Sequence, residues 1–325
     1  MFNYIIRRLL YMIPILIGVN LLTFALFFMV NTPDDIARVH LGQKHVTSGA
    51  IQTWKQHHGY DKPLFIDEKE EFPNKLVNTI FFQKSLRLFA FDFGFSDAGR
   101  DIGYDISQRM WPSLAIAIPS LIVGLLVNIS LALLMIFFRY SYLDTLGVVF
   151  CVMLMSISAL FYIIGGQYLI AKLLLLVPIS GYVPGWQLGK FLILPIIVGV
   201  ISGIGAGVRW YRTLFLEEAV KDYVRSAKSK GLKESTILFK HILRNAMIPI
   251  LTGVVALLPL LFMGSLLTES FFSIPGLGSY TIDAIQQQDF AIVRSMVFLG
   301  SFLYIIGLLM TDISYTLVDP RVRFG

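Results

Sequence analysis

Residues 222–249, DYVRSAKSKGLKESTILFKHILRNAMIP, form a charged stretch between two long apolar segments. In and just before this stretch, apolar and basic residues recur at helical spacing. The apolar stripe consists of Val220, Tyr223, Val224 and Ala227, and the basic stripe beside it of Lys221, Arg225 and Lys228. Gly231 is expected to end the helix, because glycine is free to adopt a positive φ. The pattern predicts a short helix at a membrane surface. We expect a partner outside the membrane to bind this helix.

A second helical pattern follows and runs into the next apolar segment. It consists of Ile237, Leu238, His241 and Ile242. Pro249 lies near the start of that segment, removes a backbone donor and is expected to kink the helix. We therefore expect a short helix, a sharp corner and a helix rigidly joined to a membrane span, so that a push on the first helix tilts the span. A basic helix resting on anionic lipid is the alternative interpretation of these residues.

The whole chain has the composition of a membrane protein. Apolar residues make up 56% of its 325 residues and charged residues only 15%, and the mean hydropathy is +0.71. Soluble domains are less apolar and more charged. Uncharged apolar runs of about 18 residues or more predict six spans: Leu9–Val30, Ser113–Phe138, Thr145–Ala171, Phe191–Val208, Ala246–Thr268 and Ser295–Thr311. The sequence therefore predicts an all-α integral membrane protein with six transmembrane helices.

Lysine and arginine near the span ends predict the orientation, because cytoplasmic loops carry an excess of both. Nine basic residues lie in the loop 209–245 between the fourth and fifth spans, and others flank the spans on the same side: Arg7, Arg8, Arg139, Arg321 and Arg323. Only Lys172 and Lys190 go against the rule. Both termini and the 209–245 loop are therefore expected in the cytoplasm.

The chain is predicted to have three parts. Residues 1–30 hold the N-terminal tail and first span, residues 31–112 a small extracytoplasmic domain, and residues 113–325 a core with the other five spans. The ten Lys and Arg of the external domain nearly balance its eleven Asp and Glu. This balance argues against a nucleic-acid-binding or anionic-lipid surface.

Within the external domain, Thr47 or Ser48 is expected to cap a helix that runs to His58 and ends at Gly59. Adjacent His57 and His58 would point about 100° apart on that helix, which argues against a metal site. The only cysteine, Cys151, lies inside a predicted span. Packing rather than a disulfide is therefore expected to hold the domain.

The predicted spans contain no Asp, Glu, Lys, Arg or His. Ion-driven transporters and intramembrane enzymes normally need such residues within the membrane, and the sequence has no Gly-x-x-x-x-Gly-Lys-Ser/Thr phosphate loop. We therefore expect no catalytic residue, metal site or cofactor in this chain, so that energy for transport would come from elsewhere. Uncharged polar residues of the spans either line a path or only hydrogen-bond between helices. The path candidates are Asn128, Ser156, Ser158 and Gln167.

Two glycine-containing features predict close packing. Gly199, Gly203 and Gly207 fall on one face of the fourth span, where another helix of this chain or of a partner could approach closely. The residues from Phe271 to Gly278 include two aromatics, a proline and two glycines. They are typical of a compact, partly re-entrant turn buried against protein, and we expect it near the external mouth of a path. A plain connector with aromatic interface anchors is the alternative.

The residues from Asp222 to Leu232, followed by His241 and then Arg244-Asn245-Ala246, resemble the Glu-Ala-Ala loop of ABC importer permeases. More narrowly, they resemble the peptide/nickel branch, with Arg225-Ser226-Ala227 at the triplet and Gly231 at the family's glycine. The resemblance implies that this loop docks in a cleft of a separate ATP-binding subunit. The coupling residues that it implies are Asp222, Tyr223, Arg225, Ser226, Ala227, Lys228, Gly231, His241, Arg244 and Asn245.

The resemblance extends over nearly the whole chain. Its other markers are Arg7-Arg8-Leu9-Leu10 with Ile13-Pro14, the stretches 59–64, 93–96 and 269–278, and Asp319-Pro320-Arg321. The external domain and the Asp-Pro-Arg ending are similar to the first of the two permease subunits in dipeptide and oligopeptide systems. The resemblance implies the type I ABC importer permease fold. It also implies an external gate or binding-protein side formed by Glu269, Phe271, Phe272, Pro275, Gly276 and Gly278.

The resemblance further implies a set of partners in a bacterial plasma (inner) membrane. They are a second permease subunit, two ATP-binding subunits that hold ATP and Mg, and an extracytoplasmic substrate-binding protein. No nucleic acid and no ATPase site in this chain are expected. The expected substrates are di- and oligopeptides, while similar permeases carry nickel complexes, glutathione-like peptides or peptide antibiotics. A secondary transporter or channel is a remote alternative, since neither an ion site nor inverted repeats are evident.

Three positions depart from the family's pattern. Lys233 stands where a capping serine is frequent, and because lysine cannot accept a hydrogen bond from the backbone, the second loop helix is expected to fray. Gln288 and Ala291 stand where arginine and proline are usual. The Gln288 departure weakens any inference about substrate from that loop.

Overall fold

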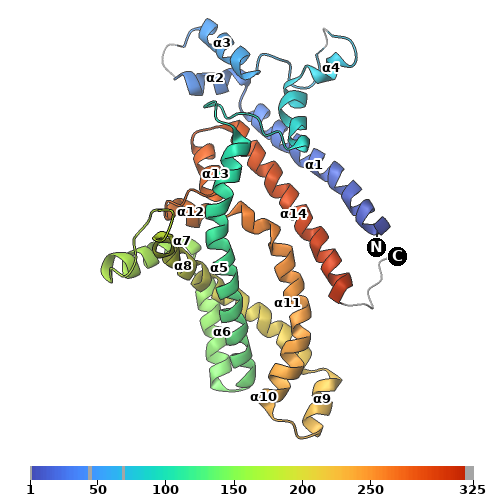
Figure 1. Cartoon of the computed structure of the whole chain (residues 1–325), viewed down its shortest axis with the longest axis vertical. Coiled ribbons are helices and arrows are strands. Elements are labelled where there is room, and N and C mark those ends of the chain that lie inside the picture. The colour runs from blue at the N-terminus through green and yellow to red at the C-terminus, as the bar shows by residue number, and fades with distance from the viewer. Residues whose placement is uncertain (1, 43–45, 68–69, 319–325) are drawn as a thin grey trace. The chain divides into compact units, whose positions relative to one another are not determined.

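The structure is a computed structural model that describes residues 2–42, 46–67 and 70–318, and these residues are mostly helical (Figure 1). The long helices are α1 (Phe2–Val30), α5 (Ile102–Phe137), α8 (Leu188–Ala219), α11 (Arg244–Leu257) and α14 (Phe290–Val318). The shorter ones are α2 (Pro33–Leu41), α3 (Ser48–His58), α4 (Asn74–Val77), α6 (Tyr142–Met155), α7 (Ala159–Gly166), α9 (Asp222–Ser229), α10 (Glu234–Thr236), α12 (Leu266–Phe271) and α13 (Leu277–Gln286). Wider or tighter helical turns cover Phe81–Ser85, Leu86–Ala90, Gln167–Leu173, Ile237–Leu243 and Pro259–Met263. In the part that the structure describes, Phe95 and Asp101 form an isolated β-bridge and no strand occurs. The all-α prediction is confirmed, while Asp319, Pro320, Arg321 and Arg323 lie outside the described residues.

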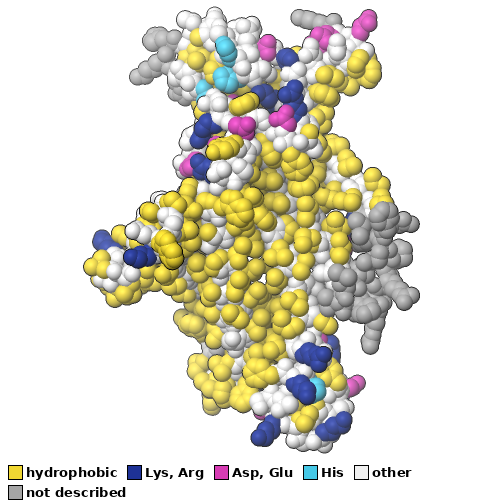
Figure 2. All heavy atoms as spheres, viewed as in Figure 1, with side chains coloured by type: hydrophobic (Ala, Val, Ile, Leu, Met, Phe, Trp, Pro, Cys, Tyr) yellow, Lys and Arg dark blue, Asp and Glu magenta, His cyan; other side chains and the backbone are white. Residues whose placement is uncertain are grey.

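Five helical stretches are long and apolar enough to cross a membrane. They are Ile6–Phe28, Ile102–Phe137, Leu188–Ala219, Glu234–Phe271 and Phe290–Ser314. A sixth span results if the bent pair Tyr142–Met155 and Ala159–Leu173 counts as one crossing. Figure 2 shows hydrophobic side chains along the helical shafts and a group of Lys and Arg side chains over α9 and α10. This distribution is that of an integral membrane protein.

The predicted span Thr145–Ala171 corresponds to the bent pair of α6 and α7, between which the chain turns by 89°, and not to one straight helix. Ser156 ends α6, and its hydroxyl donates to the carbonyl of Val152 at 2.9 Å. Ser158 then adopts an extended conformation at the start of α7. Serine hydroxyls offer the backbone alternatives to continued helix, and the Tyr162 hydroxyl closes the corner by donating to the Leu154 carbonyl at 2.8 Å.

The described residues divide into two compact units, one of residues up to 108 with 281–306, the other of residues 109–280 with 307–318. The first unit has an aromatic core. Phe24 and Phe28 of α1 are buried against Tyr60, and Phe290 packs against this cluster. The Asn20 amide donates to the Ser85 carbonyl at 2.7 Å in a buried contact. The segment that follows α1 thus packs against α1 and α14, two membrane helices of the same chain.

Helix α3 of this unit begins and ends where the sequence predicts. The side chain of Thr47 accepts from the backbone N–H of Ala50, and α3 runs from Ser48 to His58. Gly59 closes it in the left-handed conformation, with φ +68°. The predicted start and end of this helix are therefore confirmed.

The second unit is centred on α8, which packs along α6. Arg212 of α8 donates twice to the carboxylate of Asp144 in α6, at 3.0 Å and 2.9 Å. Cys151 of α6 is buried in the apolar core of this unit. A bidentate arginine–carboxylate contact fixes the relative register of two helices more strictly than apolar contacts do.

Glycines of α8 allow its close approach to other helices of the same unit. A Cβ on Gly207 would collide with the Asn128 side chain of α5, and one on Gly205 would lie 2.6 Å from the Cys151 carbonyl of α6. Gly199 has only an ordinary contact with Ser120, and Gly203 has no neighbouring atom within 4 Å. The close contacts of α8 therefore involve Gly207, which was predicted, and Gly205, which was not among the three predicted glycines.

Candidate functional site

The helix α9 packs one face into the core of the second unit. Val224 and Ala227 are 1% and 5% exposed and lie in one cluster with Ile237, Leu238 and Ile242. This is the apolar stripe that the sequence predicts, except that Val220 is exposed. Gly231 ends the turn after α9 with φ +73°. The helix is therefore seated on its neighbours by small and branched side chains.

A polar contact fastens α9 to the end of α8. The hydroxyl of Tyr223 donates to Glu218 at 2.5 Å, and the ammonium of Lys221 donates to the other oxygen of the same carboxylate at 2.5 Å. The Asn245 side chain forms a further hydrogen bond with Tyr223. Burial, followed by the hydrogen bond to Glu218, raises the pKa of Tyr223 to about 12. Tyr223 therefore remains a neutral donor that connects α9 with both α8 and α11.

After the turn at Gly231, the chain from α10 into α11 is one continuous helical path. The short α10 passes into a π-helical turn over Ile237–Leu243 and then into α11, which continues through Pro249. Lys233 precedes α10 without a side-chain cap, in agreement with its chemistry. The π turn was not predicted, since the pattern Ile237, Leu238, His241 and Ile242 fits an α-helix equally well. Such turns are frequent at functional sites.

The opposite face of α9 is open and charged. Asp222 and Arg225 form an ion pair at 3.6 Å, but their side chains are 97% and 75% exposed. An exposed pair of this kind contributes little to stability. Ser226 and Lys228 are exposed beside it, as are Arg244 at the start of α11 and Asn245, while His241 is half-buried. This surface is chemically suited to contact another protein.

A second constellation surrounds Glu269 at the end of α12. Its carboxylate is 1% exposed. One oxygen accepts from the Ser265 amide at 3.2 Å and the other from the Ser279 amide at 3.1 Å. The Ser113 hydroxyl and the Gly278 amide also hydrogen-bond to this side chain. Glu269 therefore connects the start of α12 with the start of α13.

Glycines make room for that carboxylate. A Cβ on Gly264 or on Gly276 would collide with its oxygens, and one on Gly278 would lie 2.6 Å from the Ser265 backbone. Phe272 and Ile274 within the turn are each 1% exposed, whereas Phe271 is 41% exposed and Pro275 is also exposed. The turn is compact and buried on one side, with an aromatic and a proline on its surface.

The four path candidates occupy different environments. Ser156 and Ser158 form the corner between α6 and α7, and Asn128 faces Gly207. The Gln167 amide donates to the Phe271 carbonyl at 3.0 Å and so connects α7 with the Glu269 turn. A cavity of about 620 Å³ in the second unit is lined by a different polar set, namely Ser113, Ser120, Ser202, Ser265, Thr268 and Glu269. None of the four candidates lines this cavity.

The expectation of spans without ionisable residues holds only for the shorter predicted boundaries. The helical spans reach further and include Glu269 and Arg294. Asp144 of the bent pair also forms an ion pair with Arg212 of α8. An uncharged apolar run ends at the first charged residue, so these ionisable residues fall outside the predicted spans. Burial and pairing, which make a charge tolerable in a helix of this kind, depend on tertiary contacts.

Comparison with known proteins agrees with this architecture. The family described as "Binding-protein-dependent transport system inner membrane component" matches residues 128–324, and the N-terminal family of such membrane components matches residues 1–100. The glutathione transport system permease protein GsiC of Escherichia coli K12 is 28% identical over 331 residues, with all of both chains covered. GsiC of Shigella flexneri serotype 5b (strain 8401) is 28% identical over 327 residues, and GsiC of Salmonella paratyphi A over 331, again over the full length of both chains. The chain therefore belongs to the family of inner-membrane permease components of binding-protein-dependent transport systems, the ABC importers.

Proposed function

We propose that this chain is one of two different permease subunits of an ABC importer, and that it couples its half of the path to ATP hydrolysis through α9. Two ATP-binding subunits, which hold ATP and Mg, would be the partners, and the exposed face of α9 would bind to them. An extracytoplasmic binding protein would deliver the substrate. Both termini and the 209–245 loop would lie in the cytoplasm of a bacterial cell.

The fastening of α9 to two different spans carries this proposal. Tyr223 contacts Glu218 of α8 and Asn245 of α11, while Val224 and Ala227 are buried among residues of the π turn. A force on the exposed face, at Asp222, Arg225 or Lys228, therefore reaches both helices through short, packed contacts. Coupling of this kind needs a contiguous path and an element with two states.

Peptides are the proposed substrate class. The family and the full-length similarity to permeases of glutathione transport, itself the transport of a small peptide, support this class. Di- and oligopeptides, glutathione-like peptides, peptide antibiotics and nickel complexes are the candidates within it or next to it. Because the cavity beside Glu269 is lined by small hydroxyl groups and apolar side chains, selectivity is expected to reside largely in the binding protein.

The test is purification of the chain in mild detergent with its native neighbours, followed by measurement of the ATPase rate with and without binding protein and peptide. We expect two ATP-binding chains and a second permease to co-purify, and peptide-loaded binding protein to raise the rate. Purification of the chain without any ATPase would contradict the proposal. Stimulation by a nickel complex but by no peptide would keep the importer and change the substrate.

A further inference from the structure

A cavity of about 500 Å³ lies within the first unit, apart from α9 and from the Glu269 turn. Its lining includes His58, Lys84, Phe93, Phe95, Asp97 and Arg294. A cavity of this size and mixed lining is typical of small-molecule sites. Nothing in the coupling mechanism uses it.

The most unusual residue of the lining is Arg294 near the start of α14. The residue is only 6% exposed, and its Nε atom is buried without a hydrogen-bond partner among the described residues. It follows Phe290, the first residue of α14, by four positions, so it lies near the positive end of the helix dipole. A buried cation in this position is costly unless an anion accompanies it.

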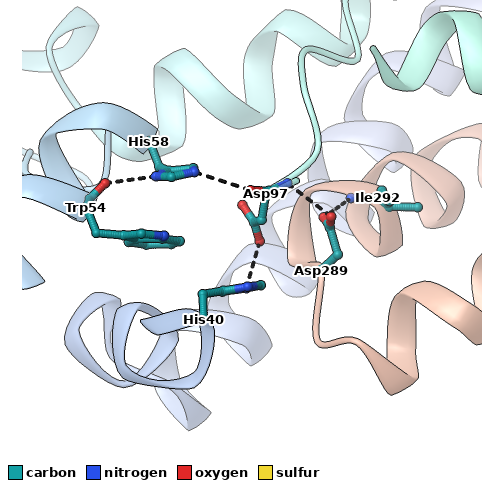
Figure 3. Close-up of polar contacts among 6 residues, drawn as sticks. All are labelled: His40, Trp54, His58, Asp97, Asp289 and Ile292. Carbon is teal, nitrogen blue, oxygen red and sulfur yellow. Dashed lines mark hydrogen bonds and ion pairs between the residues drawn. The ribbon is translucent and has the colours of Figure 1, made fainter. Parts of the chain in front are cut away.

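Two acids, Asp97 and Asp289, act on Arg294 through their charges, and Figure 3 shows the contacts that these acids make with other groups. One carboxylate oxygen of Asp97 lies 3.4 Å from Nε2 of His40. Asp289 accepts from the backbone N–H of Asp97 at 3.0 Å and from that of Ile292 at 3.2 Å, which caps α14. Within the described part of the chain, neither acid comes within ion-pair distance of Arg294.

Lys84 is a second cation in the same cavity. Its ammonium lies 5.1 Å from the centre of the buried Tyr60 ring. Burial lowers the pKa of Lys84, and the charge of Arg294 lowers it further. Two positive groups that repel each other inside one cavity would both be relieved by a shared anion.

We propose that this cavity is an anion-binding site, in which Arg294 and Lys84 hold the carboxylate of a small organic molecule. The planar guanidinium of Arg294 matches a carboxylate in two hydrogen bonds. Phe93 and Phe95 supply an apolar wall for the rest of the ligand. Asp97 in the same lining disfavours a multiply charged anion, whereas Asp92 is paired with Arg87 at 3.9 Å, so a monoanion fits better than phosphate.

A short peptide with a free C-terminal carboxylate is the ligand that we assign, and this choice of molecule rests on the function proposed above. The inference that the cavity binds a carboxylate does not rest on that function. Binding to the purified assembly without ATP separates the two questions, because transport and ATP hydrolysis are not needed for it.

The experiment uses the full-length chain purified with its native partner subunits, and calorimetric titration with two matched probes. N-acetyl-trialanine carries the carboxylate, and N-acetyl-trialanine amide lacks it. We expect the acid to bind at least about tenfold more tightly than the amide, the difference that one charged hydrogen-bond pair supplies. Equal affinity of the two probes, or of the acid and inorganic phosphate, would overturn the proposal.

Variants then locate the site. Arg294→Gln and Lys84→Gln are expected to weaken binding of the acid about tenfold or more, and Arg294→Lys less than Arg294→Gln. Arg100→Gln is the matched control, since Arg100 is a half-exposed cation of the same unit that pairs with Asp105 outside the cavity. Unchanged binding in Arg294→Gln would refute the site. If this variant does not fold, the comparison of acid and amide on the unaltered chain still decides.

Discussion

Tyr223 of α9 donates a 2.5 Å hydrogen bond to Glu218 at the end of α8. The two residues lie five positions apart, on either side of the corner where α8 stops and α9 starts. The same carboxylate accepts from Lys221, so one acid near the end of α8 holds two groups at the start of α9. The corner is therefore a polar joint rather than a hinge.

Replacement of Tyr223 by Phe should loosen this joint without emptying the space. The ring remains, but Glu218 loses one donor and Asn245 loses its partner, a loss of about 1 kcal/mol. We expect ATP hydrolysis to continue while peptide uptake per ATP falls several-fold. Uptake and ATPase rate measured together in vesicles check this. Phe239→Tyr, a surface exchange of the same two side chains in the π turn, serves as control, and full coupling in Tyr223→Phe would remove the joint from the mechanism.

A double change of Ala227 and Gly231 to phenylalanine should abolish uptake. Ala227 is 5% exposed and has no room for a ring, and Gly231 adopts φ +73°, which bulky residues rarely tolerate. Because both positions lie outside the spans, membrane insertion should remain normal, as blotting of membrane fractions would show. Lys230→Phe, an exposed neighbour, is the control. Normal uptake by the double variant would show that the α9 region does not transmit the force.

Gly276→Ala should destabilise the turn around Glu269. The added methyl group would collide with the carboxylate, and overpacking of this kind costs about 2 kcal/mol. Gly253→Ala is the matched control, because Gly253 lies inside α11 with open space around its Cα and alanine favours helix. Thermal unfolding of the two variants in detergent should separate them by several degrees, and equal midpoints would contradict the packing described here.

Glu269→Gln should destabilise the same turn by a different route. Both carboxylate oxygens accept backbone N–H groups, and a glutamine amide presents two hydrogens to one of these donors. Leaving a buried N–H without an acceptor costs roughly 1–3 kcal/mol. Protease resistance of the α12–α13 turn provides the measurement, with Glu217→Gln on α8 as control. A variant as resistant as the parent would mean that the carboxylate is not needed to hold the turn.

His40 should make the first unit less stable as the pH rises. The hydrogen bond to Asp97 raises the pKa of His40, against a smaller opposing effect of burial. A raised folded-state pKa gives stability that is fully present below the ordinary value of about 6.5 and is lost as pH rises through the folded value. Burial raises the pKa of Asp289 as well, which acts with the same sign, so a comparison of variants is required.

The comparison is of unfolding midpoints at acid and alkaline pH. His40→Gln should lower the midpoint at acid pH and leave it nearly unchanged at alkaline pH. The exposed His57, replaced by Gln, should alter neither. A pH dependence as steep in His40→Gln as in the parent would assign the effect to other groups.

Local signals in the sequence predicted local structure well. Thr47 and Gly59 gave both ends of α3, and the spacing of Val224, Ala227 and Gly231 gave α9 and its buried face. Each of these features depends on residues within a few positions of one another. Hydrophobic runs likewise gave the positions of the spans, since a run of that length has few other uses in a folded chain.

Two local features were not predicted, because local spacing does not distinguish them from a regular helix. The corner at Ser156–Ser158 is closed by a hydrogen bond of Tyr162, and the π turn has the same apolar spacing as an α-helix. Other features depend on distant neighbours, since the burial of Glu269 beside Ser113 and of Arg294 in the cavity with Lys84 follows from tertiary packing alone. Asn128 was one of several polar candidates, and its contact with Gly207 could not be read without the placement of α5.

The pairing of Asp144 with Arg212 sets a condition on how the protein is made. The two residues are 68 positions apart, so at a synthesis rate of about 5–20 residues per second the acid emerges roughly 3–14 s before its partner. Until α8 has been made, Asp144 lacks the arginine that pairs with it in the folded chain. The contact between α6 and α8 therefore forms only after both helices have been synthesised.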